Sequence, residues 1–139
     1  MESPHSIDKV ARSDADWREQ LDPDAYAVLR QAATEAPFTG AYVDEKAAGT
    51  YRCRGCSAEL FASGTKFDSR SGWPSFTDPA VAEAVELRTD GSHGMARTEV
   101  LCARCGGHLG HVFDDGPGES GQRFCINSVA LDFDPGAAD

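Results

Sequence analysis

The sequence has no long apolar run and few basic residues, and each absence excludes a class of protein. No stretch of the chain approaches the ~18–20 consecutive apolar residues that a membrane-spanning helix needs. Residues 1–16 are polar and have no apolar segment typical of a secretory signal. Thirteen Lys and Arg against 23 Asp and Glu give a formal charge of −10. This charge disfavours binding to nucleic-acid phosphates, because such binding needs a basic surface.

Internal repeats of the length found in solenoids and propellers are also lacking, and the 139 residues are the right size for one domain. We expect residues 1–13 to be a flexible lead, residues 14–133 to form the domain, and residues 134–139 to be a flexible tail. Polar and small residues at chain ends are typically frayed.

The sequence pattern changes after about the first 40 residues. Before that point, Asp22 and Pro23 are typical of a helix N-cap and a first helical position, so we expect two short helical pieces in a region that ends at Gly40. After it, short apolar or β-branched runs alternate with Gly, Ser, Asp and Pro, a pattern typical of short antiparallel strands. The sequence therefore predicts one α+β domain, mainly antiparallel β. The expected strands lie in Gly49–Arg52, Leu60–Phe61, Val81–Arg88, Arg97–Leu101, His111–Phe113 and Arg123–Phe133.

The five cysteines are the most informative residues. An odd number is not typical of a disulfide framework, and we expect a reducing compartment, the cytoplasm, that keeps the thiols free. Four of them form two Cys-x-x-Cys pairs, Cys53 with Cys56 and Cys102 with Cys105. This spacing lets both sulfurs of a pair reach one tetrahedral ion.

Together the two pairs predict a structural zinc site. Because 45 residues (57–101) separate them, we expect the two turns to come from strands distant in sequence but adjacent in space, with the metal clamping the sheet. Four thiolates leave no open coordination position for catalysis. The alternative is that one pair is a dithiol redox couple and the other incidental, which two matched pairs flanked by glycine disfavour.

Cys125 lies outside the pairs and is therefore the candidate nucleophile. The thiolate is the reactive form of cysteine. Arg123 and Asn127 would share its face of a strand, because side chains alternate along a strand. The alternative is a buried structural cysteine, since free cysteine behaves as a small hydrophobe.

Two histidines and a tryptophan favour the interpretation of Cys125 as a nucleophile over that of a structural cysteine. His108 and His111 directly follow the second pair, and from a neighbouring strand one of them could donate a proton or orient a water near Cys125. The alternative is a histidine bonded only to backbone. Trp73 precedes Pro74, which restricts it to an extended backbone, so its indole can wall a pocket for a methyl or thioether group. The alternative is a core tryptophan.

Taken together, nine segments resemble the B-type peptide-methionine (R)-S-oxide reductases, in family order and over nearly the whole domain. The segments are Pro37–Gly40, Tyr51–Cys56, Lys66–Ser69, Gly72–Phe76, Ser92–Met95 with Arg97–Val100, Cys102–Cys105, His108–Phe113, Asp115–Pro117 and Arg123–Asn127.

The resemblance implies two antiparallel sheets with short N-terminal helices and a zinc ion far from the chemistry. It implies that Cys125 attacks the sulfur of a methionine (R)-sulfoxide and that His111 helps to protonate or polarise the oxygen. His108 and Asn127 would belong to the same hydrogen-bonded shell. The products would be methionine and Cys125 sulfenic acid. The implied substrate-binding residues are Trp73, which would hold the substrate methyl group, together with His108, His93 and Phe113.

One position departs from the family pattern. Many members carry a second, resolving cysteine two residues before the motif tryptophan, where this chain has Ser71. With the other cysteines assigned to zinc, we expect thioredoxin or a small thiol to reduce the sulfenic acid directly. The resemblance implies oxidised proteins or peptides as substrates, and we expect a monomer with no nucleic-acid or membrane partner.

Three other functions fit part of the pattern. A zinc-ribbon module that recruits protein or nucleic acid would use the cysteine pairs, but the acidic charge disfavours nucleic acid. An exchange-factor-like zinc protein with a related sheet architecture would have no reason to keep Cys125, His111 and Trp73 together. A thiol enzyme acting on another small electrophile would use Cys125, and a stereospecific assay on methionine sulfoxide separates it from a reductase.

Overall fold

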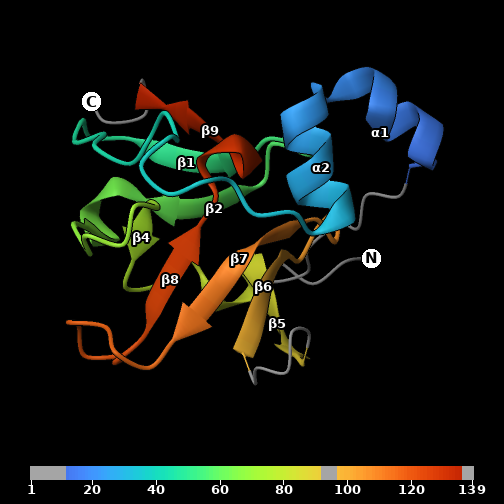
Figure 1. Cartoon of the computed structure of the whole chain (residues 1–139). Helices are drawn as coiled ribbons and strands as arrows, with labels where there is room; N and C mark the ends of the chain where they lie inside the picture. Colours follow the sequence, from blue (N-terminus) through green and yellow to red (C-terminus); the bar gives the residue numbers. More distant parts are fainter. Residues whose placement is uncertain (1–11, 92–96, 136–139) are drawn as a thin grey trace, which may run out of the picture.

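The computed structural model describes residues 12–91 and 97–135 as two helices, nine strands and three short 3₁₀ helices (Figure 1). The helices are α1 (Asp14–Gln20) and α2 (Pro23–Gln31), and the 3₁₀ helices are η1 (Ser63–Thr65), η2 (Ala82–Ala84) and η4 (Ser128–Ala130). The strands are β1 (Thr50–Cys53), β2 (Glu59–Ala62), β3 (Lys66–Phe67), β4 (Ser75–Phe76), β5 (Val85–Asp90), β6 (Arg97–Cys102), β7 (His108–Phe113), β8 (Arg123–Ile126) and β9 (Leu131–Asp134).

Both helices begin at a side-chain cap that satisfies a free backbone N–H. The Ser13 hydroxyl accepts a hydrogen bond from the Asp16 N–H, and the Asp22 carboxylate accepts one from the Ala25 N–H, with Pro23 in the first turn. The cap predicted at Asp22 is therefore confirmed.

The helical region ends earlier than predicted. Helix α2 stops at Gln31 because Ala32 adopts a left-handed backbone, with φ of 58°. Gly40 therefore does not end a helix, and the chain after Ala32 continues as a loop. Neither helix in the described ranges is long and apolar enough to cross a membrane.

The strands form two antiparallel sheets, which confirms the predicted fold class. One sheet has three strands in the order β2-β1-β9, and the other has six in the order β3-β4-β8-β7-β6-β5. Figure 1 shows the helices gathered at one side of the sheets. There α2 packs against β7 and η4, both of which carry or adjoin residues of the site described below.

Two expected strands are broken by 3₁₀ turns. The segment Arg123–Phe133 is not one strand: β8 belongs to the six-stranded sheet and β9 to the three-stranded sheet, and η4 carries the chain from one to the other. In Val81–Arg88, the first part forms η2, and the strand begins only at Val85. Strand β9 also extends to Asp134, one residue into the segment predicted as a tail.

An aromatic core fixes the two sheets against each other. Phe61 of the small sheet stacks on Phe76 of the large sheet, with ring centroids 4.4 Å apart, and lies 5.9 Å from Phe124. Tyr51 meets Phe76 edge to face at 5.2 Å. Burial raises the pKa of the Tyr51 hydroxyl. Phe76 and Phe124 face each other on β4 and β8, so this core also holds the strand that carries Cys125.

Strands β7 and β8 approach each other unusually closely at Gly110. A Cβ atom there would lie 2.0 Å from the carbonyl oxygen of Cys125. Glycine is therefore required at this position by space, since no methyl group fits against the opposing backbone.

Replacing Gly110 with alanine should push β7 away from β8 and destabilise the fold by about 3 kcal/mol, the upper range for overpacking. Urea unfolding would measure the loss. Gly64→Ala is the matched control, because nothing lies within 4 Å of the added Cβ. Equal stability of the two variants would contradict the close approach of the strands.

Candidate active site and metal centre

The four paired cysteines meet in one cluster, as predicted. Cys53 ends β1 and Cys102 ends β6, and the turns that follow these strands bring Cys56 and Cys105 back beside them. All four sulfurs lie within 4.8 Å of one another. The prediction that the metal clamps one sheet is wrong in one respect: β1 and β6 belong to different sheets, so the cluster joins the two sheets.

The spacing of the sulfurs fits a tetrahedral ion. The distances between Sγ atoms are 3.6 Å for Cys53 and Cys105 and 3.6 Å for Cys56 and Cys102. Four sulfurs at the usual zinc–sulfur distance would lie ~3.8 Å apart along each tetrahedral edge. The cluster can therefore hold one metal ion with little rearrangement.

Electrostatics also favour a bound cation. Hydrogen bonds from the neighbouring thiols, together with burial, raise the pKa of Cys53, whereas hydrogen bonds from Cys105 and its neighbours lower the pKa of Cys102. Without a cation, the sulfurs must share protons, because several buried thiolates at this distance repel one another. A divalent cation lets all four ionise.

The helices pack directly on the two metal-binding turns. A Cβ at Gly55 would lie 3.2 Å from the Trp17 ring, and one at Gly107 would lie 2.8 Å from Leu29. Arg30 of α2 donates a hydrogen bond to the Cys105 carbonyl at 3.0 Å. The cluster therefore positions α1 and α2 as well as the sheets.

Purified protein should contain one metal ion per chain, and Cys102→Ser should abolish its binding and lower the free energy of unfolding by about 3 kcal/mol or more. Elemental analysis and urea unfolding measure the two effects. Cys125→Ser is the matched control and should keep the full metal content. Full metal content in Cys102→Ser would contradict the assignment.

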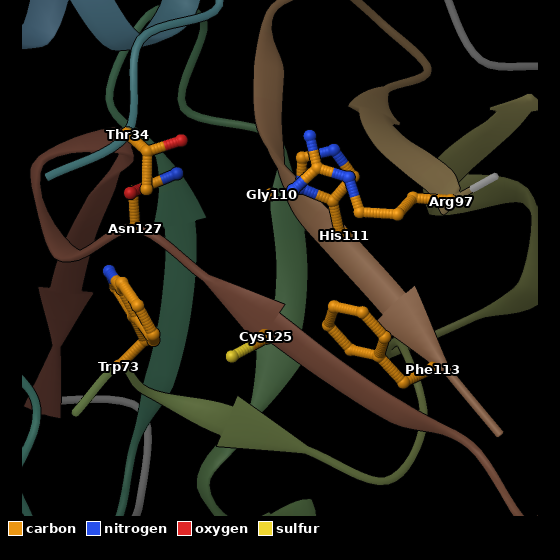
Figure 2. A pocket seen from close by; sticks show the side chains of 8 residues that line it. All are labelled: Thr34, Trp73, Arg97, Gly110, His111, Phe113, Cys125 and Asn127. Carbon is orange, nitrogen blue, oxygen red and sulfur yellow. The ribbon is translucent and has the colours of Figure 1, made fainter. Parts of the chain in front are cut away.

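A separate pocket of about 400 Å³ surrounds Cys125. Its lining comes from the loop after α2, from the segment before β4, and from β6, β7 and β8. Figure 2 shows the Cys125 sulfur between the Trp73 and Phe113 rings, with His111 on the neighbouring strand. The lining residues are Thr34, Trp73, Arg97, Gly110, His111, Phe113, Cys125 and Asn127.

Cys125 and His111 lie directly opposite each other in the β7–β8 pair. Residues paired in this way project from the same face of a sheet, and both side chains are partly exposed and line the pocket. The prediction that a histidine reaches the Cys125 face from a neighbouring strand is therefore confirmed for His111.

Several hydrogen-bond donors surround the Cys125 sulfur. Arg123 Nη1 and the Ser71 hydroxyl each lie 3.5 Å from Sγ, and the Ser75 hydroxyl lies 3.9 Å away. The Asp115 carboxylate accepts a hydrogen bond from Arg123 Nε at 2.8 Å, and this raises the pKa of Arg123 and lowers that of Asp115. The guanidinium therefore stays charged within hydrogen-bond distance of the Cys125 sulfur.

Three serine hydroxyls form a chain that ends at this sulfur. Ser69 Oγ lies 2.7 Å from the Oγ atoms of both Ser71 and Ser75, and Ser75 donates to the Trp73 carbonyl at 3.1 Å. Each hydroxyl carries one hydrogen, so if Ser75 donates to that carbonyl and Ser69 donates to Ser75, then Ser71 donates to Ser69 and accepts from a Cys125 thiol. For Ser71 to donate to the Cys125 sulfur instead, Ser69 must donate to Ser71 and Ser75 to Ser69, and the hydrogen bond from Ser75 to the Trp73 carbonyl is given up.

Trp73 forms one wall of the pocket, as expected from Pro74. Its ring N–H donates to the Glu35 carbonyl at 2.9 Å. The backbone N–H of Glu35 in turn donates to Asn127 Oδ1 at 2.9 Å, and its carboxylate accepts from the Val129 N–H at 3.0 Å. Glu35, in the loop after α2, therefore orients both the Trp73 indole and the Asn127 amide.

Asn127 directly follows the last residue of β8, but its backbone is still extended and its N–H donates to the Leu109 carbonyl at 2.9 Å, so it continues the pairing with β7. It is 3% exposed, and its Nδ2 donates to the Leu109 carbonyl at 2.9 Å. Its amide nevertheless lines the pocket. Asn127 therefore faces the same pocket as Cys125, as predicted.

His108 is placed differently from His111. It is 4% exposed and does not belong to the pocket lining. Its Nδ1 lies 2.6 Å from a carboxylate oxygen of Glu99, and its ring meets the His111 ring edge to face at 5.4 Å. His108 therefore contacts His111 from within the protein. A direct role in substrate binding stays a prediction.

Two predicted residues remain, Phe113 and His93. Phe113 lines the pocket, with Arg123 over its ring at 4.6 Å, and His93 lies outside the described residues. Sequence reasoning missed Thr34 and Arg97 as lining residues. Arg97 stood in a matching segment that could have signalled it, whereas no pattern marked Thr34.

Comparisons with known proteins agree with this geometry. Residues 21–135 match the SelR domain family. A protein of Bradyrhizobium diazoefficiens named peptide methionine sulfoxide reductase MsrB is 60% identical over 128 residues, which cover 92% of each chain. Proteins with the same name from Leifsonia xyli subsp. xyli and Methanosarcina mazei are 57% and 53% identical. Their alignments cover 91% and 90% of this chain and 92% and 89% of those relatives.

Proposed function

Because the chain belongs to the SelR domain family of B-type methionine sulfoxide reductases, we propose that it reduces methionine (R)-sulfoxide in peptides and proteins to methionine. It is an oxidoreductase, as its relatives' shared name implies. The observation that carries the proposal is Cys125 paired across two strands with His111, in a pocket walled by Trp73.

In the proposed reaction, the Cys125 thiolate attacks the sulfoxide sulfur and forms a sulfur–sulfur bond, while His111 donates a proton to the sulfoxide oxygen from the opposite strand. The sulfur–oxygen and sulfur–sulfur bonds of this adduct then break as the protonated oxygen moves to the Cys125 sulfur, which releases methionine. The methionine sulfur is reduced by two electrons, and Cys125 is oxidised to a sulfenic acid that retains the oxygen. Arg123 and Ser71 stabilise the attacking thiolate through the contacts described above.

The pocket also explains which groups of the substrate could be recognised. The Trp73 and Phe113 rings on either side of the sulfur offer apolar surface to the substrate methyl and methylene groups (Figure 2). Asn127, held by Glu35 and Leu109, sits where its amide can face the polar sulfoxide. We propose that His108 supports the orientation of the His111 ring.

The metal in the proposed enzyme is zinc, held by Cys53, Cys56, Cys102 and Cys105. When bound, it supplies a structural clamp between the sheets and leaves no open coordination position for substrate. The cluster shares no residue with the pocket lining, so the two groups of sulfurs have separate roles.

Regeneration proceeds through an external thiol, which we propose to be thioredoxin or a small thiol. The first thiol forms a mixed disulfide with Cys125 and releases water from the sulfenic acid, and a second thiol then restores the Cys125 thiol. The proposed compartment is the cytoplasm, since a reducing environment keeps the four metal-binding thiols available. The proposed active form is the monomer.

Cys125→Ser should lose methionine (R)-sulfoxide reductase activity by at least about 10³-fold, since it removes the nucleophile. Turnover of separate (R) and (S) epimers with dithiothreitol measures this, and the wild-type enzyme should act on the (R) epimer. Residual activity near the wild-type level would contradict the role of Cys125, and turnover of neither epimer by the wild-type enzyme would contradict the proposed function.

Ser71→Cys should create a resolving thiol, because the Ser71 hydroxyl lies 3.5 Å from Cys125 Sγ. After one turnover without reductant, the new thiol should displace water from the sulfenic acid and form a disulfide with Cys125. Mass spectrometry of unreduced peptides detects the bond. Wild-type protein treated in the same way should give a dimedone adduct at Cys125, and a disulfide there would contradict the proposed one-cysteine mechanism.

A further inference from the structure

A second groove adjoins the catalytic pocket and shares a wall with it. Trp73 lines both, so the two spaces adjoin at this residue. The groove has about 540 Å³ of free space, and the rings of Phe38 and Phe67 also line it. In an extended peptide, each residue advances about 3.3 Å. Residues one or two positions from a methionine sulfoxide in the pocket would therefore reach this groove.

Phe38 is held in a costly position at the edge of this groove. It is 70% exposed, the most exposed of the large apolar side chains that the structure describes. Its φ of 66° lies in the left-handed region, which bulky residues rarely adopt. Its N–H donates to the Gly72 carbonyl at 2.7 Å, and Gly72 has φ of 97°, where a Cβ would lie 2.5 Å from the Pro37 Cβ.

This arrangement has no benefit for the core. An aromatic ring left in water buries little apolar surface, and backbone strain of this kind persists where a binding role requires it. Gly72, whose carbonyl accepts the hydrogen bond from Phe38, directly precedes Trp73 in the chain. The same backbone that presents the catalytic indole therefore also presents the Phe38 ring.

The charges in the groove favour a cationic occupant. The exposed carboxylates of Asp44 and Asp68 line it, against one guanidinium, Arg70. The Lys66 ammonium beside them donates to the carbonyl oxygens of Val43 and Glu45, at 3.1 and 3.0 Å, and fixes the segment that carries Asp44. A lysine or arginine can lay its aliphatic stem on an aromatic ring and direct its charge to a carboxylate.

We propose that this groove binds a lysine or arginine side chain one or two residues from the methionine sulfoxide of a peptide substrate. The inference rests on the proposed reductase function and adds a sequence preference to it. The chain's formal charge of −10 acts in the same direction over a longer range.

The test compares kcat/KM for short blocked peptides that carry lysine, leucine or glutamate on either side of methionine (R)-sulfoxide, with dithiothreitol as reductant. The lysine peptide should be preferred over the glutamate peptide about tenfold at low salt, and the preference should narrow at high salt. The Asp44→Asn, Asp68→Asn double variant should reduce the preference to about twofold. Asp16→Asn with Glu19→Gln removes the same charge from exposed positions of α1, and this control should keep most of the preference.

The aromatic contribution has its own variants. Phe38→Gly removes the ring at a backbone angle that suits glycine, and should lower kcat/KM for the lysine peptide about fivefold. Phe38→Tyr keeps the ring and should keep the rate. N-acetylmethionine (R)-sulfoxide does not extend into the groove. The Phe38→Gly and Phe38→Tyr variants should therefore have nearly equal kcat/KM for this small substrate.

Equal kcat/KM for the three peptides, or a preference for leucine, would overturn the inference while the reductase function stands. So would variants that keep the peptide preference and raise only the KM for thioredoxin, because the groove would then serve the reductant. Failure of the wild-type enzyme to reduce N-acetylmethionine (R)-sulfoxide would instead overturn the proposed function itself.

Discussion

The pairing of β7 with β8 is the constraint on which the site depends. Because Gly110 lets the two backbones approach, His111 lies directly opposite Cys125. A shift of one residue in this register would turn every side chain of one strand to the other face, and would part the imidazole from the sulfur. The aromatic core, with Phe76 and Phe124 paired on β4 and β8, keeps the register on the other side of Cys125.

The cysteine cluster supports the same site indirectly, by holding the elements that carry it. By joining the ends of β1 and β6, it unites the two sheets and supports α2. The loop that follows α2 then delivers Glu35, whose backbone and carboxylate contact Trp73, Asn127 and Val129. Four sulfurs thus join the elements of the framework, and the fifth, that of Cys125, lies in the separate pocket that this framework holds.

Local patterns were sufficient for much of this arrangement. Cysteine spacing predicted the metal cluster, and the Asp22–Pro23 signal predicted the start of α2, because both depend on a few neighbouring residues. The early end of α2 at Ala32 and the change of sheet at η4 were missed, because they depend on packing between segments far apart in sequence, such as α2 against η4. No sequence pattern predicts the contacts of Glu35 with the site or the chain of serine hydroxyls that includes Ser71. These are ordinary polar residues that acquire their roles only from the fold.

The central claim is that one sulfur reacts while four remain bound to a metal. The most direct test is a single turnover of metal-loaded wild-type protein with methionine (R)-sulfoxide and no reductant, followed by intact and native mass spectrometry. The account predicts one methionine formed per chain, a mass gain of roughly 16 Da from a sulfenic acid located at Cys125, and full retention of the metal. Oxidation within either Cys-x-x-Cys pair with release of the metal, while Cys125 stays reduced, would contradict it.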